Sequence, residues 1–168
     1  MNAALRARLL LALVVGGPAI AGCDQKSTAR TDRLVLSPAK PSASGTLPIR
    51  APGYGVHDYT VLPIDTTAFT TGGTLEIDVR VSPASPIPGS FDLYPPAWTV
   101  AVTGYPTSAA SAYDVAAGMT DRLIYRFARG EIIAFAVEGN WFAEKGRRGS
   151  VSYQATVRPP AGKSTTGN

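Results

Sequence analysis

Two side chains with distinctive chemistry occur only once each in the 168-residue sequence, the thiol of Cys23 and the imidazole of His57. A single cysteine excludes a disulfide framework within the chain, a cysteine-rich zinc site and an iron–sulfur cluster. A single histidine removes most designs for a metal-dependent hydrolase. We therefore expect no metal and no cofactor. The surroundings of Cys23 are the more informative, because Ile20, Ala21 and Gly22 precede it directly.

The residues before Cys23 have the three parts of a secretory signal. Arg6 and Arg8 give a cationic start, and an apolar core follows over Leu9–Val15 before glycine and proline break it. An apolar core of this length falls well below the ~20 residues that cross a hydrocarbon layer of ~30 Å. Residues 1–22 are therefore predicted to be a cleaved signal peptide and not a permanent membrane span.

The motif Ile20-Ala21-Gly22-Cys23 resembles the lipobox of bacterial lipoproteins. The resemblance implies a diacylglyceryl group on the Cys23 thiol, cleavage before Cys23, and acylation of the new amino group by a fatty acid such as palmitate. Two or three acyl chains hold a protein stably to a bilayer, whereas one does so only marginally. The alternative is a soluble secreted protein whose cysteine is incidental.

The residue after the motif bears on the membrane that holds the protein. Asp24 resembles the signal that retains lipoproteins in the inner membrane of enteric bacteria, although it could equally be the polar start of a spacer. We expect a membrane lipoprotein with its body on the extracytoplasmic, periplasmic side. The inner membrane is favoured over the outer.

The stretch after Cys23 has the composition of a flexible linker. Residues 24–53 contain four prolines and no aromatic residue, so they bury too little apolar surface to offset the entropy of ordering. We expect residues 23–53 to form a lipidated, flexible tether, within which Leu34-Val35-Leu36 could add an edge strand.

Charge separates this tether from the body of the protein. Residues 24–53 carry five basic and two acidic side chains, for +3, and residues 54–158 carry eight and ten, for −2. Basic groups beside a lipid anchor suit anionic headgroups. The body lacks the basic balance of a nucleic-acid-binding domain, so nucleic acid is excluded as a partner.

Residues 54–158 have the pattern of a series of short strands. Apolar and polar side chains alternate over Thr74–Ser82, Trp98–Val102 and Val151–Val157, which is typical of strands with one buried face. Turn signals between such runs favour two packed sheets. We predict an all-β fold, a single antiparallel β-sandwich of jelly-roll or immunoglobulin-like type with seven or eight strands. A disordered tail is expected over residues 159–168.

Further strands and one hairpin are expected within the same region. The remaining predicted strands cover residues 59–65, 90–94, 122–128 and 131–138. The last two are separated by Arg129-Gly130, a two-residue link that suits a tight β-hairpin. The domain is expected to fold from about Tyr54 without the tether.

Three segments resemble strands of the jelly-roll module at the C-terminus of secreted bacterial peptidases. They are Thr71–Val79, with its opening glycines, Phe91–Tyr94 and Gly149–Val157. The resemblance covers only part of the body and implies the sandwich fold alone.

The titratable residues of the body are weak candidates for catalysis. His57 and Asp58 are neighbours whose side chains would point apart in a strand, and no Gly-x-Ser-x-Gly elbow is present. We therefore expect a surface or turn histidine. Glu76 and Asp78 share one face of a strand and could hold calcium or act as acid and base. Pairing with an arginine of a neighbouring strand is the simpler role.

Aromatic residues beside a basic turn are the best candidates for binding. Trp141 and Phe142 precede Arg147 and Arg148, and exposed aromatic groups commonly hold peptides or sugars. We expect a non-enzymatic module that contacts a protein or another component of the cell envelope. The alternatives are a carbohydrate-binding module for peptidoglycan or another glycan, and, less favoured, a hydrolase.

Overall fold

The structure is a computed structural model that describes residues 24–29 as backbone, and residues 33–54, 56–95 and 108–160 with their side chains. The expected signal peptide, Cys23, the predicted strand over Trp98–Val102 and residues 161–168 lie outside these ranges. Within the described ranges every regular element is a strand, and none contains a helix that could cross a membrane.

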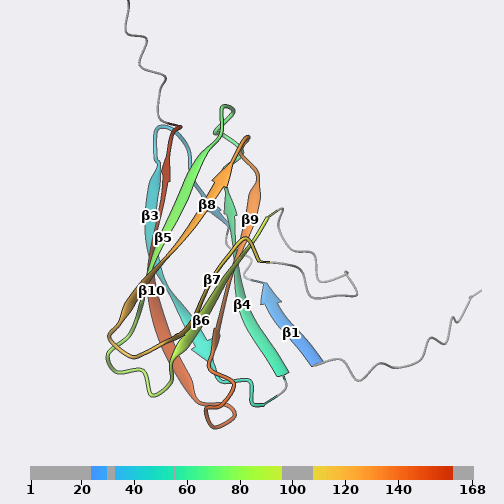
Figure 1. Cartoon of the computed structure of the whole chain (residues 1–168), viewed down its shortest axis with the longest axis vertical. Coiled ribbons are helices and arrows are strands. Elements are labelled where there is room, and N and C mark those ends of the chain that lie inside the picture. Colours follow the sequence, from blue (N-terminus) through green and yellow to red (C-terminus); the bar gives the residue numbers. More distant parts are fainter. Residues whose placement is uncertain (1–23, 30–32, 55, 96–107, 161–168) are drawn as a thin grey trace, which may run out of the picture.

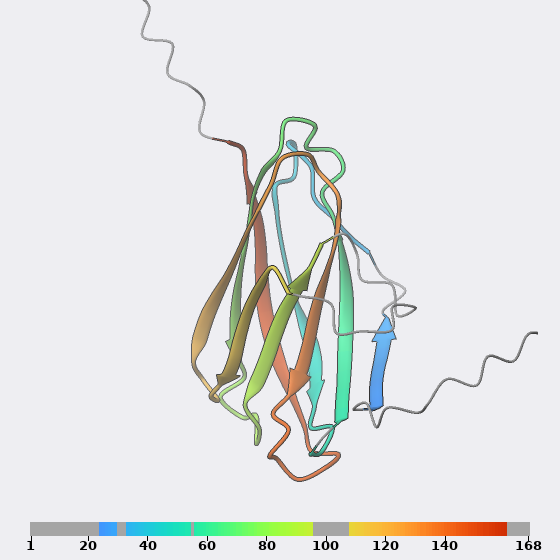
Figure 2. The same ribbon diagram turned by 45° about the vertical axis from the view of Figure 1, so that its right-hand side comes forward.

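The described residues form ten strands in two sheets that pack face to face (Figures 1 and 2). In chain order the strands are β1 (Asp24–Ala29), β2 (Leu34–Val35), β3 (Ser42–Arg50), β4 (Val56–Asp65), β5 (Gly73–Val81), β6 (Gly89–Tyr94), β7 (Ala110–Val115), β8 (Thr120–Phe127), β9 (Ile132–Gly139) and β10 (Arg148–Arg158). One sheet has the order β1-β4-β9-β6-β7, with β2 also paired to β4, and the other has the order β3-β10-β5-β8. The predicted all-β sandwich is confirmed. Its one departure from antiparallel pairing is that β1 and β2 run parallel to β4.

The core lies between the two sheets and follows the alternation of the sequence. In β5, the apolar positions from Leu75 to Val81 are at most 1% exposed, as the period of two predicts. At the centre, the Phe135 ring lies 6.4 Å from that of Phe91 and 5.9 Å from that of Tyr153. Full burial of such a side chain contributes about 1.5–3 kcal/mol, so these inner faces hold the sheets together.

Strand β3 shows that the folded domain begins well before Tyr54. It pairs with β10 over nine residues, from Ser42↔Thr156 to Arg50↔Arg148, and its Leu47 and Ile49 are each 1% exposed. The expected linker over residues 23–53 therefore contains a strand of the sandwich. The prediction of a linker was wrong because it took the low apolar content of this stretch as a sign of disorder. An edge strand such as β3 needs apolar groups on one face only.

The short run before β3 also belongs to the domain. Leu34 and Val35 pair with Ile64 and Asp65 of β4, and Leu36 is fully buried in the core. The sequence left open whether Leu34-Val35-Leu36 joins the sheet, and in the structure Leu34 and Val35 do so as the short strand β2.

The predicted hairpin between β8 and β9 is wrong. Strand β8 pairs with β5 in one sheet, whereas β9 pairs with β4 and β6 in the other. The link at Arg129-Gly130 therefore crosses from sheet to sheet. A Cβ on Gly130 would lie 1.9 Å from the carbonyl oxygen of Thr66, so glycine serves this close approach and not a two-residue turn.

Removing residues before Tyr54 is expected to prevent folding, because the chain then lacks β3 and the buried Leu36. A chain of residues 54–160 should show no cooperative thermal transition by circular dichroism, whereas residues 24–160 should show one. A cooperative transition of the shorter chain would show that β3 is dispensable.

Candidate functional site

The outer face of the six-stranded sheet carries an unusual set of buried polar side chains. On this face lie His57 and Tyr59 of β4, Glu138 of β9, and Asp92 and Tyr94 of β6, and all five are at most 7% exposed. The register brings β6 and β9 side by side, with Ser90 opposite Glu138. A sheet face turned away from the core normally meets water, so this buried cluster is the first candidate site.

The carboxylate of Glu138 is the hub of the cluster. Its Oε1 lies 2.9 Å from His57 Nδ1 and accepts a hydrogen bond of 2.7 Å from Trp141 Nε1. Its Oε2 accepts a bond of 3.2 Å from the backbone N–H of Asp58. In this contact a Glu138 carboxylate can only accept, so His57 Nδ1 is then the donor of the hydrogen bond. These contacts satisfy a side chain that would otherwise be costly to bury.

His57 is a buried residue of this hub, so the expectation of a surface or turn histidine is wrong. Its ring stacks on Tyr59 with centroids 5.1 Å apart and meets the edge of Trp141 at 4.1 Å. As predicted for neighbours in a strand, the side chain of Asp58 turns elsewhere and lies 4.0 Å from Arg50. The sequence does contain a pattern that could have predicted Glu138 as the partner of His57. Glu138 directly follows an apolar run over residues 132–137, and Trp141 comes three residues later.

Asp92 forms a second polar group on the same face. Its Oδ1 accepts hydrogen bonds from Ser111 Oγ at 2.6 Å and Tyr113 Oη at 3.0 Å, while its buried Oδ2 has no hydrogen-bond partner among the residues that the structure describes. The donors come from β7, where the register shifts between Gly89 and Phe91 of its partner and Asp114 takes a φ of 56°. The irregular strand thus directs two hydroxyl groups at one carboxylate oxygen.

The two buried tyrosines resist ionisation. Burial, then the negative charge of Glu138, raises the pKa of Tyr59 above its usual 10.0. Burial, then the charge of Asp92, raises the pKa of Tyr94 in the same direction. A side-chain hydrogen bond between the two hydroxyls favours the protonated form of Tyr59, and both tyrosines keep their protons at a pH where an exposed tyrosine ionises.

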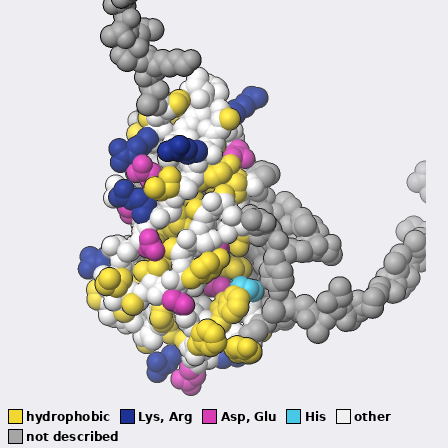
Figure 3. Space-filling view, viewed as in Figure 1, with side chains coloured by type: hydrophobic (Ala, Val, Ile, Leu, Met, Phe, Trp, Pro, Cys, Tyr) yellow, Lys and Arg dark blue, Asp and Glu magenta, His cyan; other side chains and the backbone are white. Residues whose placement is uncertain are grey.

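The loop after β9 carries the predicted binding residues and treats the two aromatic side chains differently. Trp141 is half-buried and bonded to Glu138, whereas Phe142 is 78% exposed. The Phe142 ring lies 6.0 Å from that of Tyr54, which is 83% exposed and was not predicted. Figure 3 shows hydrophobic side chains gathered beside the histidine near the lower end of the molecule.

The basic residues of the predicted site lie at the same end and are exposed. Arg147 pairs with Glu144 at 3.3 Å, and Arg148 lies at the start of β10 opposite Arg50. The loop is fixed to the neighbouring segment by two backbone bonds of 2.9 Å, from Ala51 N–H to the Arg147 carbonyl and from Gly146 N–H to the Ala51 carbonyl. The structure thus places Phe142, Arg147 and Arg148 on one exposed tip, with Trp141 as its support.

The acidic pair on the other sheet takes the simpler of its two predicted roles. Arg122 Nη2 of β8 donates to Asp78 at 3.2 Å, and Arg158 Nε of β10 lies 2.9 Å from Glu76. The predicted pairing with arginines of neighbouring strands is confirmed. In the part of the chain that the structure describes, no three histidine, cysteine or acidic residues are grouped as a metal site.

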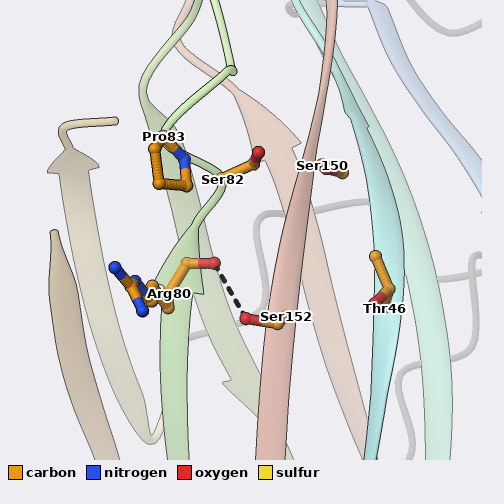
Figure 4. Close-up of a pocket in the computed structure, with 6 residues that line it drawn as sticks. All are labelled: Thr46, Arg80, Ser82, Pro83, Ser150 and Ser152. Atoms are coloured by element: carbon orange, nitrogen blue, oxygen red, sulfur yellow. Dashed lines mark hydrogen bonds between the residues drawn. The ribbon is translucent and has the colours of Figure 1, made fainter. Parts of the chain in front are cut away.

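A shallow hollow on this second sheet offers hydroxyls and one guanidinium. It is lined by Thr46, Arg80, Ser82, Pro83, Ser150 and Ser152 (Figure 4). Within it, Ser152 Oγ donates to the Arg80 carbonyl at 3.4 Å. Its lining residues include no base that could activate a serine hydroxyl.

Comparison with known proteins assigns the chain to no family. No family model and no curated protein matches the chain. A solved structure of PliG, a periplasmic inhibitor of g-type lysozyme from Aeromonas hydrophila, is 13% identical over 80% of this chain and 99% of its own, with a TM-score of 0.49.

Two further structures show weaker likeness. CorA, a surface-associated copper-binding protein of Methylomicrobium album BG8, is 9% identical over 78% of this chain and 100% of its own, with a TM-score of 0.45. The pre-peptidase C-terminal domain of a Bacillus anthracis collagenase is 16% identical over 79% and 96%, with a TM-score of 0.39. TM-scores this low assign the chain to no family.

Replacing Trp141 should destabilise the protein, whereas replacing Phe142 should not. Trp141→Phe removes the N–H that bonds the buried carboxylate of Glu138, and we expect the free energy of unfolding to fall by about 1–3 kcal/mol. Phe142→Ser changes an exposed side chain and should stay within about 0.5 kcal/mol of the original. Urea unfolding measures both, and equal effects would contradict the different roles assigned to these neighbours.

Alkaline pH should destabilise the fold through Tyr59 and Tyr94. Above the unfolded-state pKa near 10.0 the unfolded chain releases protons that the folded chain retains. The free energy of unfolding should therefore fall by about 1.4 kcal/mol per pH unit for each buried tyrosine. Urea unfolding from about pH 9 to about pH 11 measures the slope. Tyr94→Phe should make it shallower, and an unchanged slope would exclude Tyr94 as a source.

Proposed function

We propose that the chain is a lipid-anchored, extracytoplasmic protein whose β-sandwich makes contacts in the cell envelope without catalysing a reaction. The observation that carries this proposal is the motif Ile20-Ala21-Gly22-Cys23 directly after a cationic and then apolar leader. The only thiol of the chain stands at the one position where lipid attachment requires it. Exposed side chains at the tip, Phe142, Arg147 and Arg148, provide the contact surface.

The geometry of the polar cluster supports a structural role for its acids. The three hydrogen bonds on Glu138 come from a ring nitrogen, an indole and a backbone N–H. A general acid or base needs access to the proton it transfers, and Glu138 is 1% exposed. We therefore assign it to holding the tip in place.

The shape of the tip argues against a glycan as its partner. Carbohydrate-binding modules present aromatic rings as a flat platform. The Tyr54 and Phe142 rings are tilted by 45° to one another, so this pair offers no common plane for a sugar chain.

Mass spectrometry of the membrane-extracted protein tests the anchor. We expect the mature chain to begin at Cys23 and to carry the mass of a diacylglyceryl group, and Cys23→Ser to remain unlipidated. A mature protein with an unmodified Cys23, or with another first residue, would contradict the anchor.

Membrane fractionation tests the predicted sorting. Asp24 follows the lipidated residue, so we expect the protein in the inner membrane, and Asp24→Ser to move it toward the outer membrane. Outer-membrane location of the unaltered protein would contradict retention by Asp24 while leaving the anchor intact.

A further inference from the structure

Strand β1 begins at the residue that follows the predicted lipid attachment site. Asp24 pairs with Val56 at the start of β4, and the pairing continues in register to Ala29↔Val61. In Figures 1 and 2, β1 runs beside β4 along the edge of the sheet. Consecutive Cα atoms are about 3.8 Å apart, so a lipid on Cys23 would be joined to the sandwich with no spacer between them.

The end of the sandwich nearest to Asp24 is the end that carries the exposed tip. Strands β4 and β9 are antiparallel, with Thr60 opposite Val137, so β9 ends where β4 begins. The loop that follows β9 therefore lies at the same end as Asp24. Tyr54, two residues before β4, lies there as well, with its ring against that of Phe142.

This tip combines exposed aromatic groups with excess positive charge. Tyr54 and Phe142 are the two most exposed large hydrophobic residues of the described chain, at 83% and 78%. Four basic side chains are exposed around them: Arg50, Lys145, Arg147 and Arg148. Acidic side chains lie beside two of these bases, because Glu144 pairs with Arg147 at 3.3 Å and Asp58 lies 4.0 Å from Arg50. The positive charge of the tip therefore comes from the loop over residues 140–148, which has three basic side chains and one acidic one. Aromatic rings at the headgroup level and cations facing anionic lipids are the usual components of a membrane-contacting surface.

The tip is held in one conformation before any partner arrives. Trp141 is bonded to Glu138, and the Asn140 N–H donates to the Pro88 carbonyl at 3.0 Å. Asn140 Oδ1 in turn accepts the Phe142 N–H at 2.6 Å. A surface ordered in advance binds without the entropy cost of ordering.

We infer that this tip docks, together with the adjoining Tyr54, Arg50 and Lys145, on the anionic bilayer that holds the lipid of Cys23. The inference rests on the proposed anchor, because the lipid brings the tip to the membrane. A diacylglyceryl group already retains the protein, so the tip determines how the sandwich is oriented. The opposite end of the sandwich then faces away from the membrane.

A nitroxide at the tip measures this docking in the full lipidated protein. Lipidation leaves Cys23 without a thiol, so Phe142→Cys supplies a single labelling position, at which the apolar ring of the nitroxide takes the place of the phenyl ring. Ile124→Cys, a half-exposed position on β8 in the other sheet, supplies the control. The protein is reconstituted in vesicles of phosphatidylcholine alone or mixed with phosphatidylglycerol. We expect collisions of the label at position 142 with a water-soluble nickel chelate to fall severalfold in the anionic vesicles, and those at 124 to stay unchanged.

Charge variants separate docking from simple proximity to the bilayer. Arg147→Ser with Arg148→Ser should restore the nickel collisions at position 142, whereas Arg80→Ser with Arg126→Ser, exposed arginines of the other sheet, should not. Equal collisions at 142 and 124, or equal shielding in both kinds of vesicle, would overturn the inference. Shielding by isolated peptidoglycan but not by vesicles would also overturn it, in favour of a glycan contact.

The intact mass of the same sample reports on the anchor independently. A lipidated protein whose label at position 142 stays open to water contradicts the docking and leaves the proposed function standing. An unlipidated protein contradicts both.

Discussion

A carboxylate buried outside the core must be surrounded by donors, and Glu138 shows how much structure follows from that requirement. Its oxygens face the ring of His57, the indole of Trp141 and the backbone of Asp58, so the start of β4 and the loop after β9 converge on one side chain. Leaving any of these contacts unmade would strand a polar group away from water. The bond from Trp141 to this acid therefore adds to the backbone bonds at Asn140, Gly146 and Arg147 that position the loop after β9.

Side-chain alternation predicted the strands whose two faces differ strongly in polarity. Strands β5 and β10 agree with the sequence because Leu75, Ile77 and Val151 alternate with charged or hydroxylated residues. Strand β3 escaped prediction because its serines, threonine and proline give an edge strand the composition of a linker. The β8–β9 link was misjudged because the local signal of a short turn does not state whether the next strand stays in the same sheet.

The candidate site could be located only in part from the sequence, for a similar reason. Phe142 and the neighbouring arginines were identified from composition, and they are exposed. The roles of Trp141 and His57 depend on Glu138, and the partner of Phe142 is Tyr54, which lies far away in the chain. Contacts between outer-face side chains depend on strand order, which no local pattern encodes.

The place of β10 in its sheet has a consequence for when the chain acquires its structure. This last strand lies between β3 and β5, and its Thr156 accepts a hydrogen bond of 3.0 Å from Ser42, 114 residues earlier. Pairings between residues so far apart form slowly. In the four-stranded sheet β10 joins β3 to β5, so this sheet cannot form until β10 is available. A chain threaded through a membrane from its N-terminus could therefore complete this sheet only after β10 had crossed.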